Sequence, residues 1–124
     1  MSDLSFLTLL DVSRKIQSRT LSPVEVTKAE LDRIAALDPN LKSYAIVMAD
    51  SSMAPAKQAE AEIVRGEVKG PLHGVPVGAK DLCWTTNAAT ATGMTIHKDY
   101  MPSEDATSCS GSPTPTPSSS ASFN

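Results

Sequence analysis

Residues 70–82 read Gly-Pro-Leu-His-Gly-Val-Pro-Val-Gly-Ala-Lys-Asp-Leu, and this stretch decides how the rest of the chain is interpreted. Glycine and proline punctuate its first half, which predicts turns, and Val75–Lys80 is apolar up to its last residue, which predicts a short strand. Glycines also recur every four residues from position 66 to 78, a spacing found where membrane helices pack. The prolines and charged residues between them exclude that helical interpretation.

Two helix-start signals precede this strand. Thr8-Leu9-Leu10-Asp11 has the pattern of a capping box and predicts a helix that ends near Ser18. Ser22-Pro23-Val24-Glu25 combines an N-cap serine, a proline at the first helical position and a glutamate placed to bond back to the cap. This second helix is expected to run to about Leu37, with Asp38-Pro39 as its stop signal.

A further strand and a further helix are expected before residue 70. Tyr44–Met48 is short, apolar and partly β-branched, which predicts a buried strand. Residues 52–65 are rich in alanine and predict a helix, with Pro55 near its first turn and Gly66 at its C-terminal cap. Helices that alternate with short apolar strands predict an α/β layered fold.

Composition excludes several classes of protein. The chain has 124 residues, and 11 Lys and Arg against 14 Asp and Glu give a net charge of −3, which excludes a strongly basic nucleic-acid-binding protein. No run approaches the roughly 20 apolar residues that span a bilayer, so we expect no membrane partner and a cytoplasmic location. Cys83 and Cys109 are too few for a disulfide scaffold, and they lack metal-site spacing with His73 or His97.

Lys80 is the candidate catalytic residue, because it ends an apolar strand where little is available to hydrate its ammonium group. Desolvation lowers the pKa of a lysine, and a neutral lysine is a competent general base for a hydroxyl nucleophile. The alternative is an ion pair of Lys80 with Asp81 or another acid, which spacing alone favours. We expect His73 to make a turn-stabilising hydrogen bond rather than to act as an acid or base, and Cys83 to be a buried packing residue.

The stretch from Gly70 to Leu82 resembles the segment around the catalytic lysine of the amidase signature family. Other segments also resemble that family, and they occur in its usual order: Ser22–Val26, Arg33-Ile34 with Leu37–Pro39, Thr90–Met94 and Pro102–Thr107. The resemblance therefore covers about residues 8–107. The resemblance implies an α/β fold with a mixed sheet flanked by helices. It also implies an amide C–N bond hydrolase with no metal or organic cofactor and a small-molecule amide as substrate.

In that family a neutral lysine takes a proton from a bridging serine, which in turn activates a nucleophilic serine. Lys80 matches the lysine, and no serine of this chain matches either of the other two. The resemblance therefore implies an N-terminal portion of an amidase, residues 1–107, that keeps only the lysine and is inactive by itself.

Residues 108–124 differ in character from the rest of the chain. All charged residues lie at or before Asp105, and the segment that follows consists mainly of Ser, Pro and Thr, which predicts a disordered low-complexity tail. A lost base near codon 107 explains this composition, because each TCN serine codon then conceals NTC, which encodes only Phe, Leu, Ile or Val. One permitted reading of the shifted frame resembles the family's own continuation, including a Gly-Lys pair. The alternative is a flexible or glycosylated linker.

Two other functions stay open at this point. The parent protein is alternatively the amidase subunit of a tRNA-dependent amidotransferase, which uses the same lysine and serine chemistry to release ammonia. From a different class, the chain is alternatively a non-enzymatic interaction module with a disordered tail, which requires residues 1–107 to fold alone. An amidase fragment is instead expected to expose apolar faces and to aggregate or stay partly unfolded. The sequence indicates neither the amide nor an oligomeric state.

Overall fold

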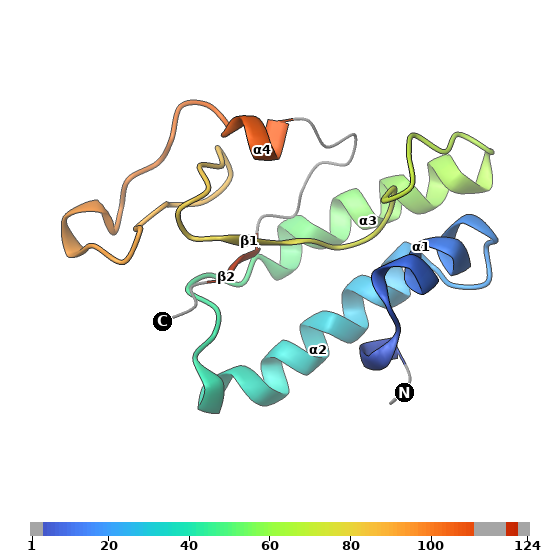
Figure 1. Ribbon diagram of the computed structural model, residues 1–124, viewed down its shortest axis with the longest axis horizontal. Helices are drawn as coiled ribbons and strands as arrows, with labels where there is room; N and C mark the ends of the chain where they lie inside the picture. Colours follow the sequence, from blue (N-terminus) through green and yellow to red (C-terminus); the bar gives the residue numbers. More distant parts are fainter. Residues whose placement is uncertain (1–3, 111–118, 122–124) are drawn as a thin grey trace.

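The computed structural model describes residues 4–110 and 119–121, and within these ranges it is rich in helix (Figure 1). No described helix is both long enough and apolar enough to cross a membrane. The elements in chain order are the 3₁₀ helix η1 (Leu4–Phe6), α1 (Leu9–Gln17), α2 (Pro23–Leu41), α3 (Ala49–Val64), β1 (Gly78–Lys80), the 3₁₀ helix η2 (Thr95–His97), α4 (Thr107–Ser110) and β2 (Ser119–Ala121).

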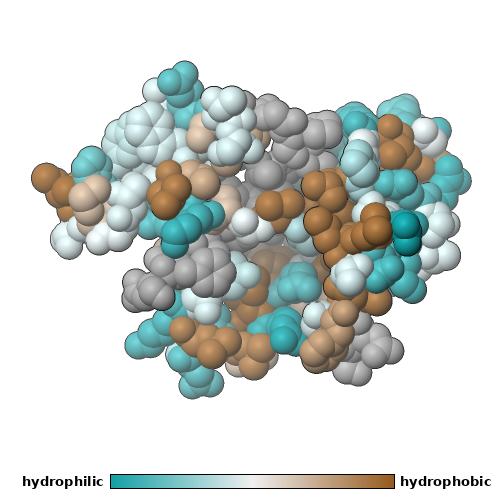
Figure 2. Space-filling model, viewed as in Figure 1, coloured by the Kyte–Doolittle hydropathy of each residue, from teal (hydrophilic) through white to brown (hydrophobic). Residues whose placement is uncertain are grey.

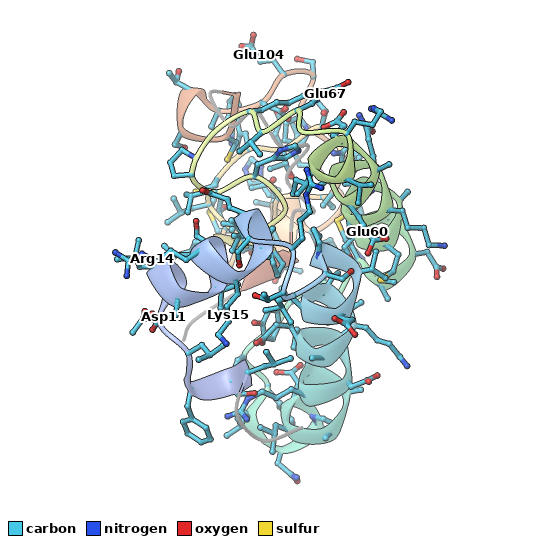
Figure 3. The ribbon with its side chains drawn as sticks, turned by 90° about the vertical axis from the view of Figure 1, so that its right-hand side faces the viewer. Asp11, Arg14, Lys15, Glu60, Glu67 and Glu104 are labelled. Atoms are coloured by element: carbon cyan, nitrogen blue, oxygen red, sulfur yellow. The ribbon has the colours of Figure 1, made fainter. Side chains whose placement is uncertain are left out.

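Both predicted helix starts are confirmed. The Thr8 side chain accepts a hydrogen bond from the backbone N–H of Asp11 at 3.2 Å, so α1 begins at the expected cap. Ser22 accepts from the backbone N–H groups of Val24 and Glu25, and the Glu25 carboxylate accepts from the Ser22 N–H at 3.2 Å. Asp11 and Arg14 of α1 lie on the outer side of the molecule in Figure 3, whereas Ser13 and Ile16 of the same helix are buried.

The predicted end of α2 is wrong, because the helix continues through Pro39 to Leu41. A proline this close to the end of a helix removes one hydrogen bond of the last turn and leaves the earlier turns intact. Asp38 instead shapes the exit from the helix: its Oδ1 accepts from the backbone N–H of Ser43 at 2.6 Å and of Tyr44 at 3.1 Å. Lys42, with φ 52°, turns the chain out of the helix.

The strand predicted at Tyr44–Met48 is not formed: Tyr44 makes an isolated bridge and the next four residues are irregular. The following helix, α3, begins at Ala49, three residues before its predicted start. The Met48 carbonyl accepts two hydrogen bonds from Ser52, one from its N–H at 3.0 Å and one from its hydroxyl at 2.7 Å. The first turn of α3 therefore uses a carbonyl that a strand would need for its ladder. Gly66 has φ 86° beyond the helix end, as predicted.

The core is small and joins the helices to the segment before β1. Its buried members are Ile16 of α1, Val26 of α2, Ile63 of α3 and Val75. α2 and α3 run beside each other in Figure 1 and contact each other directly. The Ser22 hydroxyl donates to Glu60 Oε1 at 2.5 Å, which links the start of α2 to the middle of α3.

The predicted mixed sheet is not present in the described residues. The strand predicted over Val75–Lys80 is reduced to Gly78–Lys80, because Pro76 has no N–H for a ladder and Val75 is held in a turn by the Leu72 carbonyl. β1 pairs in parallel with β2, with Lys80 opposite Ala121. The expectation that residues 108–124 are disordered is therefore wrong for the end of α4 and for β2. The rest of that segment, residues 111–118 and 122–124, lies outside the described residues.

Large apolar side chains lie exposed over much of the surface, and Figure 2 shows them as brown areas on one face of the molecule. They come from helices and loops alike. The most exposed are Phe6 at 81%, Leu41 at 66%, Val64 at 61%, Leu82 at 57% and Ile96 at 86%. The exposed large apolar side chains outnumber the buried core, so the burial of apolar side chains within the described residues is incomplete.

Candidate functional site

Lys80 is the last residue of β1, and its side chain is exposed. A turn follows at once, because the backbone N–H of Cys83 donates to the Lys80 carbonyl at 2.8 Å. The expectation that apolar neighbours desolvate Lys80 is therefore wrong for the described residues: β1 is short and leaves the lysine at its open end. The strand presents the side chain but does not enclose it.

Gly74 sets the approach of the chain to β1. Its φ is 84°, and a Cβ at this position would lie 2.7 Å from Pro23 Cγ and 3.3 Å from Ile63 Cδ1. Only glycine tolerates both the left-handed backbone and this close contact. The start of α2 and the end of α3 thereby fix the direction in which the chain leaves for Lys80.

Asp81 follows Lys80 and is buried, with 6% of its surface exposed. Its Oδ1 accepts a hydrogen bond from the backbone N–H of Ala91 at 3.0 Å. Two further hydrogen bonds hold the loop between Asp81 and Ala91. The N–H of Ala106 donates to the Trp84 carbonyl at 2.9 Å, and Asp105 Oδ1 accepts from the N–H of Thr86 at 2.7 Å. One backbone hydrogen bond and two that aspartate side chains accept, rather than a strand, shape the segment after the lysine.

His73 is 2% exposed and takes part in a buried polar network. Its Nδ1 accepts from the backbone N–H of Lys69 at 3.3 Å, which is the turn-stabilising hydrogen bond expected from the sequence. Its Nε2 lies 3.0 Å from Glu62 Oε2. The other oxygen of Glu62 accepts from Lys69 Nζ at 2.6 Å and from Gln58 Nε2 at 3.0 Å.

Sequence analysis missed Glu62 as the centre of this network. The hydrogen bond from Lys69, and then the one from Gln58, lowers the pKa of Glu62 to about 2. One feature of the sequence could have indicated this role: Glu62 is an acidic residue next to Ile63, on the side of an alanine-rich helix that is buried. The network joins α3 to the turn before β1, so it positions the strand that carries Lys80.

Cys83 is partly exposed, so its predicted burial is met only in part, and both cysteines are unpaired thiols. The rings of Trp84 and Tyr100 meet edge to face with centroids 5.8 Å apart, which ties the segment after Lys80 to the one after η2. These contacts hold the loop in shape without an additional strand.

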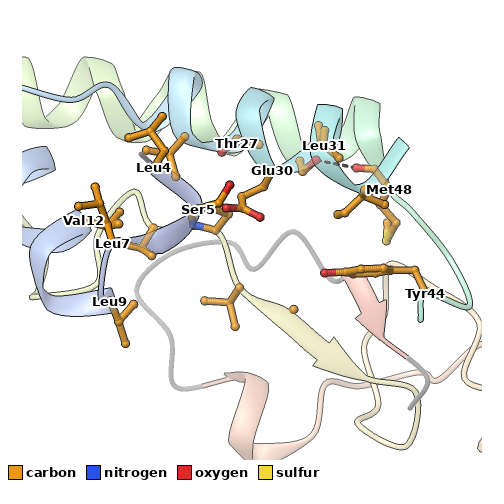
Figure 4. Close-up of a pocket in the computed structure, with 17 residues that line it drawn as sticks. Leu4, Ser5, Leu7, Leu9, Val12, Thr27, Glu30, Leu31, Tyr44 and Met48 are labelled. Atoms are coloured by element: carbon orange, nitrogen blue, oxygen red, sulfur yellow. Dashed lines mark hydrogen bonds between the residues drawn. The ribbon is translucent and has the colours of Figure 1, made fainter. Parts of the chain in front are cut away.

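A groove of about 210 Å³ lies between η1, α1, α2 and the residues before β1, and sequence analysis did not predict it. Figure 4 shows Leu4, Leu7 and Val12 on one side of it and Tyr44 and Met48 on the other. Its lining is mainly apolar, and Lys80 is not among the lining residues. The groove is smaller than the roughly 300–1,000 Å³ of typical ligand pockets.

Comparison with known proteins identifies the family. A sequence profile of the family described as Amidase matches residues 25–110, which contain Lys80. The chain belongs to the amidase family. It is 51% identical over 104 residues to the amidase homologue AmiD of Mycobacterium tuberculosis, and 40% identical over 107 residues to a glutamyl-tRNA(Gln) amidotransferase subunit of Acidothermus cellulolyticus.

These relatives are much longer than the chain. The alignments cover 84% of this chain and 22% of AmiD, and 86% of this chain and 21% of the amidotransferase subunit. The amidase chain also superposes on the peptide amidase of Stenotrophomonas maltophilia with a TM-score of 0.76 and 29% identity, over 84% of this chain and 22% of that one. The chain thus spans about a fifth of the relatives that it matches.

Proposed function

We propose that this chain contributes the lysine base of an amide hydrolase whose two serines lie in a longer form of the protein. The observation that carries the proposal is the place of Lys80, at the exposed end of β1 and inside the segment matched by the family profile. In this mechanism Lys80 Nζ takes a proton from a bridging serine, and that serine activates the nucleophile that attacks the amide carbonyl. We infer that the 124-residue chain by itself is inactive, because it contains no serine that matches either partner.

The proposal places a requirement on the surroundings of Lys80. A lysine that acts as a base must be neutral, and burial is what favours the neutral form. Because the described residues leave Lys80 exposed, we infer that the remainder of the amidase covers it. The exposed apolar residues of the surface provide area for that contact.

Resequencing the coding DNA across codons 100–124 and several hundred bases downstream tests the first part of the proposal. We expect a missing base near codon 107 and a corrected frame that runs on through a Gly-Lys pair to a Gly- and Ser-rich segment. The end of the family match at residue 110 supports a lost frame near this point. A stop codon after Asn124 in confirmed sequence would contradict a longer product.

An activity assay tests the second part. The protein from the corrected frame is assayed for ammonia release from simple primary amides, with Lys80→Ala beside a matched control, Lys98→Ala. Lys98 is also an exposed lysine, with 68% of its side chain accessible, and it lies outside β1. We expect Lys80→Ala to abolish turnover and Lys98→Ala to keep it. Amide hydrolysis by the purified 124-residue chain that Lys80→Ala abolishes would refute the inference of inactivity.

A second candidate is favoured by the relatives named as glutamyl-tRNA(Gln) amidotransferase subunits, which are up to 40% identical over most of the chain. In that case the longer protein works in a complex and releases ammonia from an amide donor for transfer. Glutamine as substrate, and a requirement for partner proteins and a charged tRNA, would support this candidate. Turnover of simple amides by the isolated protein would support the first.

A further inference from the structure

Asp81 is a buried carboxylate, and in the described part of the chain one of its two oxygens receives a hydrogen bond. It is 6% exposed, and Oδ1 accepts the N–H of Ala91 at 3.0 Å. A carboxylate has room for about four hydrogen bonds, and a buried charge is costly unless its oxygens are paired. Within residues 4–110 and 119–121, Ala91 supplies the one donor recorded for this side chain, and Oδ2 has none.

The hydrogen bond from Ala91 to Asp81 holds a turn at residues 91–94 whose backbone is strained. The N–H of Met94 donates to the Ala91 carbonyl at 2.9 Å, and the two residues between them are left-handed, with φ 51° at Thr92 and 72° at Gly93. A β-branched residue such as threonine rarely adopts this conformation, so the turn needs support from its surroundings. Asp81 supplies that support from the position next to Lys80.

We propose that Asp81 is a positioning residue for Lys80, with Oδ1 holding the turn at residues 91–94 and Oδ2 accepting a hydrogen bond from the remainder of the amidase. The donor is an N–H or O–H group of the longer protein that the proposed function requires, since little of Asp81 is open to water. This contact aligns the end of β1, and therefore Lys80, with the serine-bearing part of the protein. The inference rests on the proposed function, because it needs that longer protein.

Asp105 provides a matched control for Asp81. Its Oδ1 accepts from the N–H of Thr86 at 2.7 Å and from the Thr86 hydroxyl at 3.1 Å, so it also closes the loop after Lys80. It differs from Asp81 in being exposed, so solvent can reach its carboxylate. Any effect of loop closure alone is expected at both positions.

The test compares Asp81→Asn with Asp105→Asn in the protein from the corrected reading frame, with propionamide and benzamide as probes. Asparagine keeps an oxygen for Ala91 but replaces the unsatisfied acceptor by an NH₂ donor. We expect Asp81→Asn to lower kcat at least tenfold while KM stays within threefold, and Asp105→Asn to change neither more than twofold. A loss of kcat without a loss of substrate affinity indicates misplaced catalytic groups rather than a damaged fold.

Three results would overturn the inference. They are a kcat for Asp81→Asn within twofold of the wild type, an equal fall of kcat for both variants, and a confirmed stop codon after Asn124. Lys80→Ala separates this inference from the proposed function. If Lys80→Ala stays active, the proposed function fails, whereas an inactive Lys80→Ala beside a normal Asp81→Asn removes only the role of Asp81.

Discussion

Replacing Gly74 by alanine is expected to destabilise the chain by two separable effects. The left-handed backbone, at φ 84°, costs an L-residue about 1–2 kcal/mol. The new Cβ would also lie 2.7 Å from Pro23 Cγ and 3.2 Å from Pro23 Cβ, and relieving such overpacking costs about 1–3 kcal/mol. Because the ring of Pro23 is rigid and begins α2, the strain passes into the packing of α2 against α3. The sum is a loss of about 2–5 kcal/mol of unfolding free energy.

Gly66→Ala separates the two effects. Gly66 has nearly the same φ, 86°, but nothing lies within 4 Å of the position of its added Cβ. Urea unfolding of the 124-residue chain, followed by circular dichroism at low protein concentration, measures both variants against the wild type. We expect the Gly74→Ala midpoint to fall by about 1–2 M and the Gly66→Ala midpoint by about half as much. Equal shifts would refute the close contact of Gly74 with Pro23 as a source of instability.

Other predictions concern the buried network and the cap of α2. Because the pKa of Glu62 in the folded chain is about 2, below its ordinary value of 4.5, its contribution to stability is present above pH 4.5 and is lost as the pH falls from there towards 2. Urea midpoints of Glu62→Gln should therefore depend less on pH over this range than those of the wild type. His73→Ala leaves Glu62 Oε2 without its donor and opens a cavity, so it should lower the free energy of unfolding by about 2–3 kcal/mol. The exposed His97→Ala, measured in the same urea titration, should lower it by less than about 0.5 kcal/mol. Ser22→Ala removes the acceptor of two backbone N–H groups of α2 and the donor to Glu60, and it should cost about 1–2 kcal/mol. The exposed Ser51→Ala should be nearly neutral, and a neutral Ser22→Ala would contradict the cap.

The helices were predictable because their start signals are local. The cap of α2 depends on Ser22, Pro23 and Glu25, which lie within four consecutive positions. Ser22 and Glu25 bond to each other reciprocally, and Pro23 has no N–H that needs a partner. Gly66 is likewise recognisable from its position after an alanine-rich helix. Such contacts need no information from distant parts of the chain.

The strands and the polar network were not predictable in the same way. Tyr44–Met48 has strand composition, yet a strand needs a partner, and the nearby Ser52 takes up the Met48 carbonyl instead. The network of His73 depends on Glu62, eleven positions earlier, and no spacing rule links a residue of α3 to one in the turn before β1. In the first case a local contact replaced the expected strand, and in the second a contact between distant positions formed that no local pattern announces.

The same distinction applies to Lys80. Its position at the end of a strand followed from the local pattern of apolar residues, but the desolvation that a lysine base requires is a property of everything packed around it. Gly74, the Glu62 network and Asp81 together determine where the end of β1 lies, and none of them buries the Lys80 side chain. Under the proposed function, these contacts supply the position of the base, and the reactivity of the lysine depends on further protein packed around it.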